Sequence, residues 1–158
     1  AKLERTGRPL TSFETHTPLR DFDAVAFSVS FENDYLHVLK VLRLAGIPLR
    51  ARDRGPHDPL VILGGSALFL NPEPLAAFAD LVAVGEGEAL VPRMMDALLG
   101  GPDPRTGLQS LSHRDGFYVP QRYEVVTALP EIVDGQILVP NTPGLGVDIV
   151  EEAIAHQR

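Results

Sequence analysis

The sequence predicts an α/β fold, with a partial doubly wound parallel sheet followed by a β-rich C-terminal tail. Residues 60–63 and 81–84 are short, continuous apolar runs, which are typical of parallel strands covered on both faces. A glycine-rich corner follows each run, and a helix-like segment follows each corner. The chain therefore passes twice through strand, corner and helix.

A strand and a helix are expected before this central stretch. Residues 24–31 are apolar and partly alternating, which predicts a strand, and a shorter strand is expected around residues 10–13. A helix should then begin at Asn33 or Asp34 and end at Gly46, because leucine and valine residues between them form a wide apolar face.

The loop at residues 50–58 is expected to be solvated, because Arg50, Arg52 and Arg54 alternate there with aspartates. Between the two apolar runs, residues 75–79 look helical.

A helix is also predicted at residues 89–99, with Pro92 tolerated in its first turn. Residues 101–107 are rich in glycine and proline and indicate a linker. We therefore expect one domain at residues 1–101.

The remaining residues, 102–158, are expected to form the linker and the tail. Short strands are predicted at 117–119 and 123–126, and a short terminal helix at 149–156. Within residues 132–139 an Asp-Gly pair lies between apolar residues, which is a strong hairpin signal.

The composition bounds the function. The 158 residues carry a formal net charge of -7, which argues against nucleic acid or an anionic membrane as the main partner. The chain has no cysteine, so it can hold neither a cysteine-ligated iron–sulfur cluster nor a cysteine nucleophile. No apolar run approaches the length of a membrane span, and no signal-peptide core is evident, so a cytoplasmic protein is expected.

The strand-end corners are the candidate binding site, because ligands of open α/β sheets bind outside the carboxyl ends of the strands. The alternative is that these glycines only form turns that the fold requires. Glu86 and Glu88 are interpreted mainly as carboxylates that stabilise a helix N-terminus. No catalytic constellation is recognisable, and the histidines show no metal-ligand spacing.

Residues 18–120 resemble the N-terminal, cobalamin-binding-like domain of a radical SAM protein family. The segments that carry the resemblance are residues 18–23, 27–30, 44–50, 64–65, 71–75, 85–88 and 116–120. The resemblance implies a flavodoxin-like sheet and a non-catalytic domain that binds a cofactor, or scaffolds a catalytic barrel outside this chain. It makes cobalamin the candidate cofactor.

The resemblance also assigns candidate cofactor-binding residues, since glycine lets the backbone approach a flat ring or a phosphate and serine hydroxyls can hydrogen-bond to it. These residues are Ser28, Ser30, Gly64, Gly65, Ser66, Gly85, Glu86 and Gly87. The Asp-x-His-x-x-Gly motif that supplies a lower cobalt ligand is absent. His16 is the nearest match and is interpreted as a surface histidine.

The family's first strand and helix would precede residue 1, so strand 24–31 would be left with an open edge. We expect residues 117–126 or 136–140, or a second copy of the chain, to cover that edge. A homo-oligomer or a separate catalytic domain is thus the expected partner.

Residues 133–148 resemble the C-terminal closing segment of mandelate racemase-type enolase superfamily members. They include none of that family's metal ligands, and we interpret them as a packing segment.

Two other functions are consistent with the sequence. The same fold could be a cofactor-free interaction or oligomerisation module. Less expected is an enzyme that acts on a small phosphorylated or carboxylated substrate at the glycine corners.

Overall fold

The computed structural model describes residues 9–112, 114–122, 132–133 and 136–137. The chain divides into two compact units, one at Ala1–Gln121 and the other at Arg122–Arg158. The predicted strand at 123–126 and the predicted helix at 149–156 lie outside the described residues.

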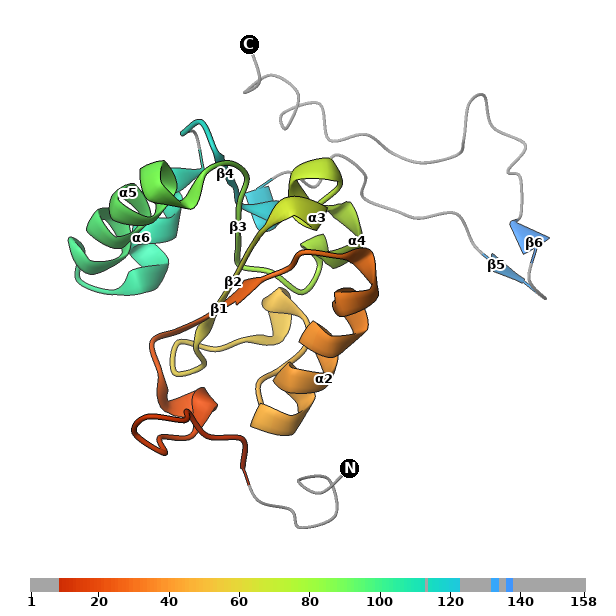
Figure 1. Cartoon of the computed structure of the whole chain (residues 1–158), viewed down its shortest axis with the longest axis horizontal. Helices are drawn as coiled ribbons and strands as arrows, with labels where there is room; N and C mark the ends of the chain where they lie inside the picture. The colour runs from red at the N-terminus through yellow and green to blue at the C-terminus, as the bar shows by residue number, and fades with distance from the viewer. Residues whose placement is uncertain (1–8, 113, 123–131, 134–135, 138–158) are drawn as a thin grey trace. The chain divides into compact units, whose positions relative to one another are not determined.

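The first unit is built on a four-stranded sheet, which Figure 1 shows between two groups of helices. Its strands are β1 (Ala24–Ser28), β2 (Leu60–Gly64), β3 (Leu81–Ala83) and β4 (Phe117–Tyr118), arranged in the order β1-β2-β3-β4. The first three strands are parallel, and β4 pairs antiparallel with β3. The predicted α/β class with a mostly parallel sheet is confirmed.

One face of the sheet is covered by α2 (Tyr35–Ala45), α3 (Ser66–Leu70) and α4 (Glu73–Ala76). The opposite face is covered by α5 (Gly87–Leu99) and α6 (Pro104–Leu111). Short 3₁₀ turns connect these elements: η1 (Leu19–Asp21), η2 (Glu32–Asp34), η3 (Ala51–Asp53) and η4 (Pro120–Arg122).

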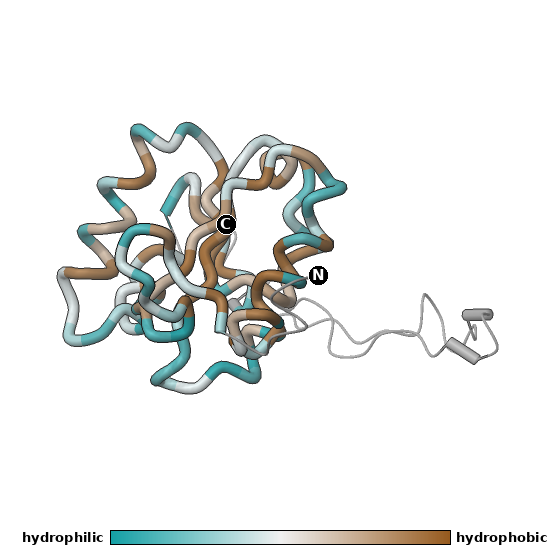
Figure 2. The backbone as a smooth tube through the Cα atoms, turned by 60° about the horizontal axis from the view of Figure 1, so that its bottom comes forward, coloured by the Kyte–Doolittle hydropathy of each residue, from teal (hydrophilic) through white to brown (hydrophobic). Residues whose placement is uncertain are grey.

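Alternation along the strands builds two cores. Val61 and Leu63 of β2 face the α2 side, whereas Leu60 and Ile62 face the α5 side, because successive side chains of a strand point to opposite faces. All four are almost completely buried, which explains the continuous apolar run. The hydropathy colouring in Figure 2 shows hydrophobic stretches running through the interior of this unit.

The predicted helix between Asp34 and Gly46 is confirmed as α2. Val38, Leu42 and Ala45 form its buried stripe, at the spacing of a helix that covers a sheet. The helix ends at Gly46, whose left-handed φ of 70° matches the glycine predicted there.

Several predicted boundaries differ. In β1 the strand ends at Ser28 rather than residue 31, because the Val29 carbonyl accepts a hydrogen bond from Ala67 N in α3 and leaves the sheet. Around residues 10–13 the structure has only an isolated bridge between Thr11 and Pro18. The helix α5 begins two residues earlier than predicted, so Pro92 lies inside it rather than in its first turn.

The linker predicted at residues 101–107 is wrong over its second half. Asp103 caps α6, accepting a hydrogen bond from Thr106 N at 2.9 Å, and Pro104 occupies its first turn. Gly107 packs directly on the Ala97 backbone of α5, where a Cβ would overlap the carbonyl oxygen. The two helices thus form a close pair within the first unit.

The predicted hairpin is present in the second unit. Here β5 (Ile132–Val133) and β6 (Gln136–Ile137) pair antiparallel on either side of the Asp-Gly pair.

Candidate functional site

The predicted site residues lie at one end of the sheet, where β1, β2 and β3 end. Parallel pairing places Ser28 opposite Gly64, and Gly64 opposite Ala83. The segments that follow the three strands therefore all leave the sheet at the same end, where the carboxyl ends of the strands lie. Two of the predicted site residues, Ser28 and Gly64, are thus neighbours as the last residues of β1 and β2.

The corner after β2 is closed by the chain itself. Gly65 has φ 108°, and a Cβ there would lie 2.5 Å from the Val29 carbonyl oxygen. The neighbouring Ser66 hydroxyl donates a hydrogen bond to the Ser30 carbonyl at 3.0 Å. Gly65 is thus required by close packing between the β1 and β2 corners, a reason that needs no ligand.

The corner after β3 is more open. Gly85 has φ 143° and faces Leu90, but a Cβ at Gly87 would meet no atom within 4 Å. Glu86 occupies the N-cap position of α5, without a side-chain cap hydrogen bond, and Glu88 lies in its first turn. Both carboxylates are where the sequence placed them, at a helix N-terminus.

Exposed apolar side chains flank the serine corner. Phe31, just after Ser30, is 68% exposed, and Phe69 of α3 is 66% exposed. The segments that carry them are joined by the Ser66–Ser30 hydrogen bond and by one from the Tyr35 hydroxyl to the Asn71 carbonyl at 3.2 Å. This end of the sheet thus combines exposed aromatic rings with a serine-rich corner, which suits an amphipathic ligand or partner.

His16 lies in the segment that leads into β1, and so at the other end of that strand from the corners. It has a φ of 54°, as a turn residue can. It is not placed to ligate a metal held at the strand C-termini.

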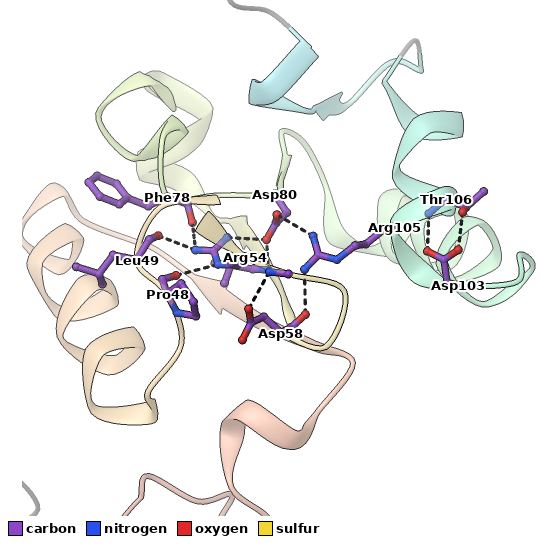
Figure 3. Close-up of polar contacts among 11 residues, drawn as sticks. Pro48, Leu49, Arg54, Asp58, Phe78, Asp80, Asp103, Arg105 and Thr106 are labelled. Atoms are coloured by element: carbon purple, nitrogen blue, oxygen red, sulfur yellow. Dashed lines mark hydrogen bonds and ion pairs between the residues drawn. The ribbon is translucent and has the colours of Figure 1, made fainter. Parts of the chain in front are cut away.

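A buried ion pair, which the sequence did not reveal, joins the loop after α2 to β3. Arg54 Nη1 donates to Asp80 Oδ2 at 2.6 Å, and the two side chains are 0% and 1% exposed (Figure 3). The prediction that Arg54 belongs to a solvated loop is wrong. A charged group taken out of water needs such partners.

Through its remaining donors Arg54 holds together two connections, the one between α2 and β2 in which it lies and the one between α4 and β3. Its guanidinium donates to the carbonyl oxygens of Pro48, Leu49 and Phe78 at 3.0, 2.7 and 2.6 Å. Burial lowers the pKa of Arg54, and the adjacent carboxylate of Asp80 opposes that shift. The role of this network is structural, since the guanidinium of Arg54 makes its hydrogen bonds to other groups of the same chain and is buried from solvent.

Arg105 extends the network to α6. Its Nη2 donates to the Asp58 carbonyl at 3.0 Å, and its Nη1 lies 3.7 Å from Asp80 Oδ1. That buried oxygen accepts no hydrogen bond. Arg105 therefore neutralises Asp80 from the helix side.

A cavity of about 510 Å³ lies next to Arg105, at the N-terminal ends of the strands. Its lining mixes both charges and consists of Arg20, Asp21, Phe22, Asp23, Pro56, His57, Asp58, Leu60, Asp103, Pro104 and Arg105. The cavity is thus on the opposite end of the sheet from the predicted site. The sequence analysis missed it because its residues come from three separate segments, at 20–23, 56–60 and 103–105.

Within the described part of the chain, no three His, Cys, Asp or Glu side chains come together in a way that could hold a metal ion. The same residues contain no helix that is long and apolar enough to cross a bilayer.

Comparison with known proteins assigns the family. Residues 1–120 match the family model described as radical SAM proteins, N-terminal. The chain is also 29% identical over 75 residues to the uncharacterized protein MJ0966 of Methanocaldococcus jannaschii. The aligned segment is 48% of this chain but only 15% of that protein. No solved structure matches. Over the sheet and both of its helical layers, the chain belongs to the family of radical SAM protein N-terminal domains.

Proposed function

We propose that this chain is a non-catalytic accessory domain of a radical SAM protein. It binds a ligand for a catalytic barrel outside the chain, or serves as a scaffold for that barrel. The observation that carries the proposal is the family match over residues 1–120. The chain itself offers no cysteine to hold an iron–sulfur cluster. The domain would therefore act by positioning a ligand or the barrel, through a surface that one of them contacts.

That surface is the end of the sheet where β1, β2 and β3 terminate. Ligands of open parallel sheets bind outside the carboxyl ends of the strands. Here this end offers the exposed ring of Phe31, the hydroxyl of Ser28 and the open backbone at Gly87. These groups can contact the flat ring of a corrinoid and hydrogen-bond to its polar edges.

Cobalamin is the ligand proposed for this surface. When bound, it would supply a redox-active cobalt ion, and the residues of this chain would only hold the ring and its tail. The fit is partial, because Gly64 and Gly65 face their own chain rather than open space. His16 is remote, so the described residues would hold the corrinoid without a histidine on the cobalt.

A second candidate, a cofactor-free interaction module, is favoured by the closure of the Gly65 corner. The backbone of Val29 fills the space that a ligand tail would need there. In that case the exposed rings of Phe31 and Phe69 contact protein instead of a corrin.

The experiment adds hydroxocobalamin to the purified chain and records the visible spectrum after desalting. Retained and shifted cobalt absorption is expected for the wild type. Gly87→Phe should abolish retention by filling the open corner, whereas Gln109→Phe, an exposed control on α6, should not. If the wild type retains no cobalamin, the cofactor proposal fails and the interaction module remains.

A further inference from the structure

Four large apolar side chains are exposed in the segments that follow β1 and β2. Phe31 and Leu36 follow β1 and are 68% and 75% exposed, and Phe69 and Leu70 follow β2 and are 66% and 77% exposed. Single apolar side chains are common on protein surfaces, whereas several together mark a contact site. We call these four residues the apolar patch.

The fold brings the two segments together at the serine corner. The Ser66 hydroxyl donates a hydrogen bond to the Ser30 carbonyl at 3.0 Å. Phe69 and Leu70 lie on the same face of α3 as Ser66, because residues three and four positions apart on a helix are neighbours. Phe31 directly follows Ser30 in the chain. These three apolar residues therefore lie around one hydrogen bond, and the patch is not a set of scattered side chains.

The same end of the sheet is acidic. The connections that follow the three parallel strands, residues 29–36, 65–74 and 84–89, contain no lysine or arginine. Their carboxylates are Glu32, Asp34, Glu73, Glu86 and Glu88. All of these are exposed except Asp34, which is half-buried and has its Oδ1 3.3 Å from His37 Nδ1.

The contacts from β4 leave this charge in place. The Tyr118 hydroxyl donates to Glu73 Oε1 at 2.8 Å, and a neutral donor does not cancel the carboxylate. The prediction that residues 117–126 cover the outer edge of β1 is wrong for β4, which pairs with β3. Just before β4, the charges of Arg114 and Asp115 offset each other. The apolar patch is therefore bordered by net negative charge.

We propose that the apolar patch binds a basic amphipathic segment of a partner protein, in which apolar side chains are flanked by lysines or arginines. The inference rests on the scaffold form of the proposed function and names the contact surface. The partner's apolar side chains would pack on the rings of Phe31 and Phe69, and its cations would lie beside Glu32 and Glu73. An amphipathic helix is a common form of such a segment.

Charge and composition disfavour the occupants that this chain itself could supply. A second copy would bring the same carboxylates against each other, because a two-fold interface uses the same surface on both chains. Residues 123–158 contain six Asp or Glu residues and one Arg. Residues 1–8 are basic, but Leu3 is their one large apolar residue, against four in the patch. A partner segment that is both basic and apolar complements the surface.

Fluorescence anisotropy tests the proposal with the full chain and a labelled peptide of leucine and lysine, patterned as an amphipathic helix. We expect saturable binding that weakens as salt is added, because salt screens the charges. A peptide with the same leucines and with glutamate in place of lysine should bind at least about tenfold more weakly. Equal binding of the two peptides, or no binding of the lysine peptide, would overturn the proposal.

Four variants test where the lysine peptide binds. Phe69→Ala and Glu32→Lys should each weaken binding by about tenfold, because one removes a ring of the patch and the other reverses a bordering charge. The matched controls are Phe13→Ala, at an exposed ring outside the patch, and Asp53→Lys, at an exposed carboxylate of η3. Both should bind like the wild type, and a loss in the controls as large as in the patch variants refutes the assignment.

Two further measurements separate this inference from its alternatives. A concentration-dependent dimer in sedimentation velocity that Phe69→Ala abolishes would make a second copy the occupant, and would overturn the proposal. Cobalamin retention distinguishes the proposal from the ligand-binding form of the proposed function. A chain that retains cobalamin but not the lysine peptide keeps that function and loses the partner proposed here. A chain that binds the peptide through Phe69 without retaining cobalamin supports the partner.

Discussion

Replacing Asp80 by asparagine should strongly destabilise the first unit. The change leaves the Arg54 guanidinium, whose side chain is 0% exposed, without the carboxylate that it contacts at 2.6 Å. It also weakens the acceptor of the 2.8 Å hydrogen bond from Val61 N. Removing one partner of a buried pair leaves an uncompensated charge, at a cost of about 3–5 kcal/mol in the free energy of unfolding.

The assay is urea denaturation followed by circular dichroism, with the free energy of unfolding taken from the midpoint and slope. Asp53→Asn is the matched control. Its carboxylate is 59% exposed and lies 3.8 Å from Arg52 Nε, so its loss should cost no more than about 1 kcal/mol.

A double variant separates the charge from the packing. Arg54→Met together with Asp80→Leu removes both charges, so part of the stability lost in Asp80→Asn should return. The recovery is expected to be incomplete, because Val61 N and the carbonyls that Arg54 contacts lose their side-chain partners. If Asp80→Asn is no more destabilising than Asp53→Asn, the ion pair does not hold the loop after α2 to the sheet.

Two further predictions concern glycine and pH. Gly65→Ala should lower the free energy of unfolding by about 2 kcal/mol or more, because φ is positive there and the added Cβ would overlap the Val29 backbone. Gly87→Ala, at a helix position with open space around it, should leave the free energy of unfolding unchanged or raise it by under about 1 kcal/mol in the same urea assay. The hydrogen bond from the Thr106 hydroxyl lowers the pKa of Asp103, so its contribution to stability is present above the ordinary value of 3.8 and is lost as pH falls through the folded-state value. Midpoints of urea unfolding measured from pH 5 downward should fall less steeply for Asp103→Asn than for the wild type, and parallel curves would contradict that cap.

The sheet could be predicted because its signals are local. The apolar runs at β2 and β3 reflect burial on both faces, and the glycine after α2 marks the end of that helix. The register then follows from parallel pairing, so the common location of the strand-end corners was also predictable.

Long-range polar contacts were not predictable in the same way. Arg54 alternates with aspartates like a surface residue, and its partner Asp80 lies 26 positions away. The one signal for it was an aspartate placed directly before a buried strand. The helix α6 was not predicted for a different reason. The Asp103-Pro104 pair was interpreted as part of a linker, although aspartate followed by proline is also a common start of a helix.

The reversed direction of β4 has a practical consequence for anyone handling this domain. Its two residues finish the sheet on one margin, and the polypeptide leaves the first unit just beyond it, after Gln121. The margin at β1 lies on the far side of the sheet, three strands away. A reporter or affinity handle joined directly after Gln121 would therefore lie next to β4 and leave the β1 side of the sheet accessible, whereas one joined close before Ala24 would lie next to β1.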